Sequence, residues 1–85
     1  MKRGYAIVVR RAKDNYSADC PDLPGCVATG RTVDETLRRM RSAIQFHIDG
    51  LRSLRQPIPR PVTKLAALVR ERGEPAIYAV VQVAA

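Results

Sequence analysis

The segment from Thr32 to Leu54 constrains the fold most, because it has the pattern of one long amphipathic helix. Thr32 precedes Glu35 by three residues, the spacing of a capping box in which each side chain accepts a hydrogen bond from the other residue's backbone N–H. The helix is therefore predicted to begin at about Val33. One stripe then recurs at steps of three and four, made of Val33, Leu37, Met40, Ile44, His47, Ile48, Leu51 and Leu54. Such a stripe needs a sheet to cover.

Four short runs have the composition of strands. Residues 5–11, YAIVVRR, are rich in β-branched side chains that alternate between two faces. Residues 16–20 and 26–30 follow after short loops, so the first three runs predict an antiparallel meander. Residues 76–84, AIYAVVQVA, form a fourth run whose simplest partner is the first.

The stretch between the long helix and the last strand contains a connector and a second helix. Pro57, Pro59 and Pro61 stand at alternate positions, which prohibits helix and favours an extended backbone. Thr63 is in place to cap a short helix over residues 65–72, LAALVRER, which Gly73 would end. The order β-β-β-α-(short α)-β predicts an α+β two-layer sandwich, a mainly antiparallel sheet with one long helix packed on it.

The composition indicates a small domain without an export signal. The 85 residues are 46% hydrophobic with no Trp and one Phe, so the core is expected to be aliphatic and oligomerisation would supplement it. The N-terminal apolar run is only five residues long and is followed by Arg10 and Arg11, which predicts neither a signal peptide nor a membrane span. We expect a cytoplasmic protein. Cys20 and Cys26 flank a five-residue turn; reduced thiols are favoured there, and a disulfide stays open.

The titratable residues do not form a catalytic or metal-binding pattern. His47 is the only histidine and lies on the apolar side of the long helix, where a packing role is the more usual one. Cys20, Asp22, Cys26 and His47 lack the paired short spacing of zinc ligands. No glycine-rich phosphate loop and no nucleophile motif is present. We predict a protein that is not an enzyme, with no catalytic residues, no metal and no cofactor.

The basic residues allow two interpretations. Fifteen Lys and Arg against eight Asp and Glu give a net charge of +7, which favours an anionic partner. One flank of the long helix carries the candidate anion-binding residues Arg38, Arg41, Arg52 and Arg55. Alternatively this flank is solvated, with arginine stems covering apolar surface. Because no aromatic residues for base stacking are interleaved, the solvated flank is favoured and nucleic acid is not the preferred partner.

Phe46 is the only Phe and should point away from the apolar stripe. On the helical wheel it lies roughly opposite Ile44 and Ile48, among small neighbours that would let another surface approach. We therefore take Phe46, with Arg39 and Ser42, as a candidate protein interface.

Several of these segments together resemble the HicB family of antitoxins from bacterial toxin–antitoxin pairs. The resemblance covers residues 5–61 and includes YAIVVRR, PDLPGC, the helix segment and QPIPRP. Beside the late Pro57-Ile58-Pro59, its motif residues are those of a turn and a helix cap, Asp22, Leu23, Pro24, Gly25, Cys26, Gly30, Thr32 and Glu35. Pieces that are weak alone are specific as a set.

The resemblance implies a partial ribonuclease H-like fold that lacks the catalytic carboxylates. It also implies a protein that binds and masks a small HicA-type ribonuclease toxin and forms a homodimer or homotetramer. We expect residues 1–85 to be a single HicB-like domain without a C-terminal DNA-binding module. The alternative is a solitary HicB-like homo-oligomer that binds nucleic acid through its basic helix flank.

Overall fold

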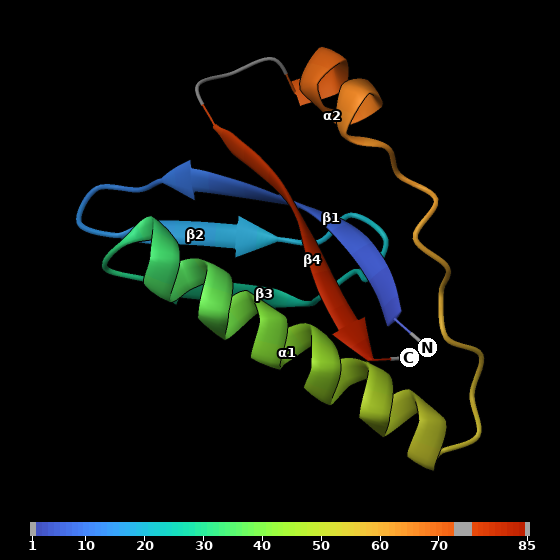
Figure 1. The fold of residues 1–85 in the computed structure, drawn as a ribbon. Helices are drawn as coiled ribbons and strands as arrows, with labels where there is room; N and C mark the ends of the chain where they lie inside the picture. The colour runs from blue at the N-terminus through green and yellow to red at the C-terminus, as the bar shows by residue number, and fades with distance from the viewer. Residues whose placement is uncertain (1, 73–75, 85) are drawn as a thin grey trace.

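The computed structural model describes residues 2–72 and 76–84. Its elements follow the predicted order and are shown in Figure 1: β1 (Lys2–Arg11), β2 (Tyr16–Asp19), β3 (Val27–Gly30), α1 (Val33–Ser53), α2 (Leu65–Arg72) and β4 (Ile77–Ala84). The α+β fold class is confirmed. Within the described residues, neither helix has the length and apolar character needed to cross a membrane.

The four strands form one antiparallel sheet in the order β3-β2-β1-β4. The prediction that the last strand pairs with the first is confirmed, with Tyr5 opposite Val81. β1 begins three residues earlier than the composition indicated, because Lys2 and Gly4 pair with the end of β4. A polar Lys-Arg-Gly start does not look like a strand in the sequence, and only the long partner strand makes it one.

The helix α1 covers one face of the sheet (Figure 1). Met40, Ile44 and Ile48 are fully buried against the odd-numbered side chains of β1, including Tyr5 and Ile7. Burying each such side chain contributes about 1.5–3 kcal/mol. The apolar stripe is thus confirmed at its centre, whereas Leu54 lies beyond the helix end and is exposed.

The helix α2 packs on the opposite face of the same strand. Alternate residues of a strand point to opposite faces, so Ala6 and Val8 face away from α1 and form a second cluster with Leu68. The helix over 65–72 is confirmed, but Thr63 does not cap it: the helix begins two residues later, at Leu65, and the Thr63 hydroxyl donates to Asp22 Oδ1. Gly73 lies outside the described residues.

The connector from residue 56 to residue 64 has no helix or strand and is held against the body of the domain. The hydroxyl of Tyr5 donates a 2.5 Å hydrogen bond to the carbonyl oxygen of Pro59, and Ile58 packs against the main core. The connector leads from the end of α1 to α2 on the other face (Figure 1). Its path is therefore fixed by side-chain contacts, since it makes no backbone ladder.

A close approach between β3 and α1 depends on Gly30. A Cβ atom built on Gly30 would lie 2.5 Å from Thr36 Oγ1 and 2.8 Å from the Thr36 backbone nitrogen. Thr36 is fully buried, and its hydroxyl donates to the carbonyl oxygen of Thr32 at 2.7 Å. The missing side chain at Gly30 lets the first turn of α1 rest directly on the strand that precedes it.

We predict that Gly30→Ala destabilises the protein by about 1–3 kcal/mol, because the added methyl group would push α1 away from β3. Gly50→Ala is the matched control: its Cβ would meet nothing within 4 Å, and alanine raises helix propensity by about 0.5–1 kcal/mol. Urea unfolding of both variants measures the difference. Equal stability of the two variants would contradict the close contact.

Candidate functional site

The motif turn between β2 and β3 is closed by its own hydrogen bonds. The Leu23 amide donates to the Cys20 carbonyl, and the Cys26 amide donates to the Leu23 carbonyl, both at 3.0 Å. The Leu23 side chain is fully buried, whereas Pro24 and Gly25 are exposed. Gly25 has φ of 85°, a conformation that glycine adopts without a steric cost. This part of the motif therefore shapes and anchors a turn.

Asp22 fastens that turn to the connector. Its Oδ2 accepts a 3.0 Å hydrogen bond from the Thr63 amide, and its Oδ1 accepts a 2.7 Å bond from the Thr63 hydroxyl. Forty-one residues separate the two partners. Because the carboxylate is used in this way, Asp22 has a structural task in the fold.

Cys20 and Cys26 are free and buried. Burial raises the pKa of the Cys20 thiol from 9.0 to about 11, and burial also raises the pKa of Cys26. Both side chains belong to the main core beside Leu23. Neutral thiols are poor nucleophiles and poor metal ligands, so this pair behaves as small apolar side chains.

The start of α1 has half of the predicted capping box. Thr32 Oγ1 accepts from the Glu35 amide at 3.0 Å, and the helix begins at Val33 as predicted. The reciprocal bond was placed wrongly: the Glu35 carboxylate accepts from the Arg31 amide at 3.4 Å, one residue before the cap. The same carboxylate oxygen also lies 3.1 Å from a guanidinium nitrogen of Arg39.

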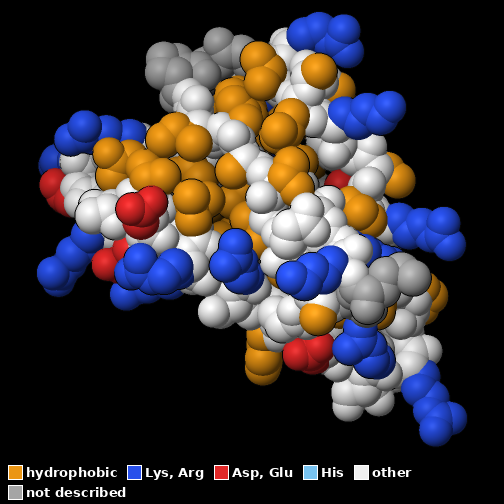
Figure 2. Space-filling model, viewed as in Figure 1, with side chains coloured by type: hydrophobic (Ala, Val, Ile, Leu, Met, Phe, Trp, Pro, Cys, Tyr) orange, Lys and Arg blue, Asp and Glu red, His pale blue; other side chains and the backbone are white. Residues whose placement is uncertain are grey.

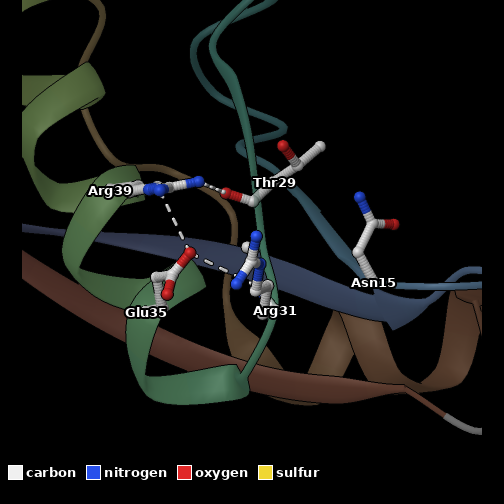
Figure 3. A pocket seen from close by; sticks show the side chains of 6 residues that line it. Asn15, Thr29, Arg31, Glu35 and Arg39 are labelled. Atoms are coloured by element: carbon white, nitrogen blue, oxygen red, sulfur yellow. Dashed lines mark hydrogen bonds and ion pairs between the residues drawn. The ribbon is translucent and has the colours of Figure 1, made fainter.

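Arg39 is held at the rim of a pocket of ≈ 400 Å³. Its guanidinium lies 3.1 Å from the Glu35 carboxylate and donates a 3.1 Å bond to the Thr29 carbonyl (Figure 3). The side chain therefore joins α1 to β3. Asn15, Gly30 and Arg31 also line the pocket.

Phe46 lies on the face of α1 that points away from the sheet. Its side chain is 82% exposed, and Ser42, one helical turn earlier, is exposed as well. Gly50, one turn later, has open space around it. The predicted exposure of Phe46 is confirmed, and its role as an interface residue stays a prediction.

The four candidate anion-binding arginines occupy different surroundings. Arg38 and Arg41 line a groove of ≈ 290 Å³ between α1 and β4. Arg52 lies 3.4 Å from Asp49 in an ion pair, and Arg55 follows the helix end with φ of 55°. Anion binding by these four arginines stays a prediction. The positive charges of Arg38 and Arg41 are less compensated by carboxylates than that of Arg52.

The described residues contain no group of three or more His, Cys, Asp or Glu side chains that could hold a metal ion. Sequence reasoning missed the contacts of two residues of α1, Thr36 and Gln45. Thr36 is a buried hydroxyl in a helix, and Gln45 bonds to the backbone of Ala84 through both atoms of its amide. Their partners are distant in the sequence, so no local pattern indicates either contact.

The turn, the helix cap and the connector together explain the positions of the motif residues. Comparison with known proteins identifies the family that has this combination. A family model described as a HicB-like antitoxin of a bacterial toxin–antitoxin system matches residues 5–85. The chain belongs to the HicB-like antitoxin family. An uncharacterised 14.9 kDa protein of Haemophilus phage HP1 is 34% identical over 56 residues, which are 66% of this chain. The match spans 42% of the phage protein.

Solved structures of HicB antitoxins share the fold. The N-terminal domain of the Burkholderia pseudomallei antitoxin HicB is 26% identical, with a TM-score of 0.86 and full coverage of both chains. A chain in a HicA3–HicB3 toxin–antitoxin complex is 24% identical, with a TM-score of 0.74 and 95% of each chain covered. At that identity the second likeness concerns the fold alone.

We predict that Asp22→Ala destabilises the protein by about 2–3 kcal/mol and Thr63→Val by about 1 kcal/mol, because the first removes both bonds of the tie and the second only the hydroxyl. The double variant should lose less than the sum, since the two side chains share one interaction. Urea unfolding gives these values. Asp14→Ala, in the exposed turn after β1, is the control and should change stability by less than about 0.5 kcal/mol. Additive losses of stability in the double variant would contradict a shared interaction between Asp22 and Thr63.

We also predict slow alkylation of Cys20 in the folded protein. A rise of the pKa from 9.0 to about 11 lowers the thiolate population roughly 100-fold at pH 8, before any effect of burial on access. Iodoacetamide labelling of Cys26→Ser, followed by mass spectrometry, measures the rate with and without urea. Since the folded pKa is the higher one, the thiol's contribution to stability is present below pH 9 and lost as pH rises through about 11. Equal labelling rates with and without urea would contradict the predicted protection of Cys20.

Proposed function

We propose that this protein is an antitoxin that binds and masks a small HicA-type ribonuclease toxin, without catalysis of its own. The observation that carries the proposal is the match of the HicB-like antitoxin model to residues 5–85. The likeness to the N-terminal domain of the Burkholderia pseudomallei HicB supports it. A chain of the same fold occurs in a HicA3–HicB3 toxin–antitoxin complex, so the fold is compatible with a partner of that class.

The toxin-binding surface in this proposal is the outward face of α1, around Phe46, Ser42 and Arg39. An aromatic ring supplies a large apolar area at a low entropic cost, and such residues anchor many protein interfaces. The small side chain of Ser42 leaves room beside the ring. Arg39 is already positioned by Glu35, so a partner would find it ordered before binding.

Masking needs only steric coverage. A stable interface buries about 1,200–2,000 Å² in total, and a toxin active site within that area would be closed to RNA. The antitoxin side then needs no titrating group. A partner bound at this surface would leave the core of the described residues unchanged, because Phe46 is exposed and belongs to neither core cluster.

The charge supports a second candidate, a homo-oligomer that binds nucleic acid. The net charge is +7, and Arg38 and Arg41 form no ion pair in the described part of the chain. Phosphate contacts would make the affinity fall steeply with salt. A homodimer or homotetramer is part of both candidates, since a chain of this size has a small core.

We predict that Phe46→Ser weakens binding of a HicA-type toxin from the same genome at least tenfold, because it removes the interface anchor. The variant should fold normally, since the side chain is 82% exposed. Val62→Ser is the matched control, an exposed apolar residue in the connector, and should bind as the wild type does. Calorimetry with a catalytically inactive toxin measures both affinities.

Unchanged affinity of Phe46→Ser would place the toxin interface elsewhere. A failure of the wild-type protein to bind or inhibit the toxin, together with salt-sensitive binding to a short RNA, would favour the nucleic-acid candidate. Light scattering on the free variants separates a further case: a lower mass for Phe46→Ser alone would place Phe46 between copies of this chain.

A further inference from the structure

The strand β4 is one edge of the sheet, because the strand order is β3-β2-β1-β4. The Gln45 side chain bonds to Ala84 at this edge: its Nε2 donates to the Ala84 carbonyl at 2.7 Å, and its Oε1 accepts from the Ala84 amide at 2.9 Å. The backbone groups of Ala84 therefore point away from β1. In an antiparallel strand these directions alternate, so the N–H and C=O of Gln82 and Val80 point to the same open edge.

Gln45 does at residue 84 what the peptide group of a neighbouring strand would do. Its amide carries one donor and one acceptor side by side, which is the pairing that a β-ladder uses. In the part of the chain that the structure describes, no other side chain pairs with this edge of β4. The edge is thus closed at its end and open along Val80 and Gln82, and an open edge is a template for another strand.

A groove runs beside the open edge. It has a volume of ≈ 290 Å³ and is lined by Asp34, Leu37, Arg38, Arg41, Ala79, Val80 and Val81. Val80 is 46% exposed. Figure 2 shows apolar side chains gathered beside β4, with Lys and Arg side chains following α1 beneath them. The groove therefore offers an apolar strand edge on one wall and guanidinium groups on the other.

The charge of the groove selects its occupant. Arg38 and Arg41 face one carboxylate, Asp34, which leaves an excess of positive charge. A second copy of this chain would bring another net charge of +7 and the same arginines to the contact, and like charges oppose that pairing. An acidic partner is instead attracted by the excess of positive charge in the groove.

We propose that the open edge of β4 binds an extended acidic segment of another protein by strand addition. The segment's backbone pairs with Val80 and Gln82, and alternate acidic side chains reach Arg38 and Arg41 across the groove. The intervening side chains lie on the other face, beside the exposed Val80. The pair of bonds between Gln45 and Ala84 marks where the added strand ends. This proposal does not rest on toxin masking, because it concerns a different surface from that of Phe46.

The test uses a capped octapeptide in which Glu alternates with Val and Thr. In ¹H–¹⁵N spectra of the full chain, we expect saturable shifts at residues 78–84 and along residues 34–41. Arg38→Gln with Arg41→Gln should raise the Kd at least tenfold. The matched pair Arg52→Gln with Arg55→Gln removes equal charge away from the groove and should change the Kd less than threefold.

Strand pairing is tested separately from charge. Val80→Pro removes an N–H that faces the open edge, a position where proline is tolerated, and should abolish binding while the spectrum stays folded. If that variant does not fold, the same peptide N-methylated at alternate residues replaces it and should not bind the wild-type protein.

Four results would overturn the proposal. The first is an absence of shifts at millimolar peptide, and the second is unchanged binding by Val80→Pro or by the N-methylated peptide. The third is equal binding of a peptide with Lys in place of Glu. The fourth is a protein that without peptide is a dimer paired through this edge, with twice the mass of the single chain. RNA binding that depends on Arg38 and Arg41 while the peptide leaves residues 78–84 unshifted would assign the groove to phosphate instead.

Discussion

Burial of β1 on both faces is the constraint on which the rest of the domain depends. Its five residues from Tyr5 to Val9 are almost fully buried, with odd-numbered side chains under α1 and even-numbered ones under α2. Its backbone pairs with β2 on one side and β4 on the other. A strand in this position has no solvated face, which is why a chain of 85 residues needs two helices and a connector long enough to reach both faces.

The connector explains why two distant proline-containing segments belong to one motif. Tyr5 holds Pro59, and Asp22 holds Thr63, so the turn after β2 and the strand β1 together determine the path from α1 to α2. A stiff segment loses less entropy when it is fixed at two points than a flexible one does. The motif residues of the turn thus have a structural reason to be what they are, apart from any contact with a partner.

Local patterns in the sequence predicted which elements form and where the helices begin, but they did not predict the side-chain contacts between distant residues. The cap at Thr32 placed the start of α1 at Val33, and helical spacing placed α2, because both depend on near neighbours. Contacts between distant residues leave no such pattern in the sequence. Thr63, for example, was predicted to cap a helix, whereas its hydroxyl donates a hydrogen bond to Asp22. The same holds for the contact of Gly30 with Thr36 and for Gln45 at the end of β4. The proposed sites are surface features, and exposure of Phe46 was the one that helical spacing could predict.

The surface arginines show why charge alone does not assign a binding site. Arg39 and Arg52 look like Arg38 and Arg41 in the sequence, yet Glu35 and Asp49 already occupy them. An exposed pair of this kind contributes little to stability, and it lowers the net positive charge that the guanidinium presents to an anionic ligand, while it still positions the side chain for other contacts. Arg38 and Arg41 differ because they stand over a groove whose other wall is an open strand edge. Backbone groups and guanidinium groups that face one groove restrict the ligand more than net charge does, because the ligand has to be both extended and acidic.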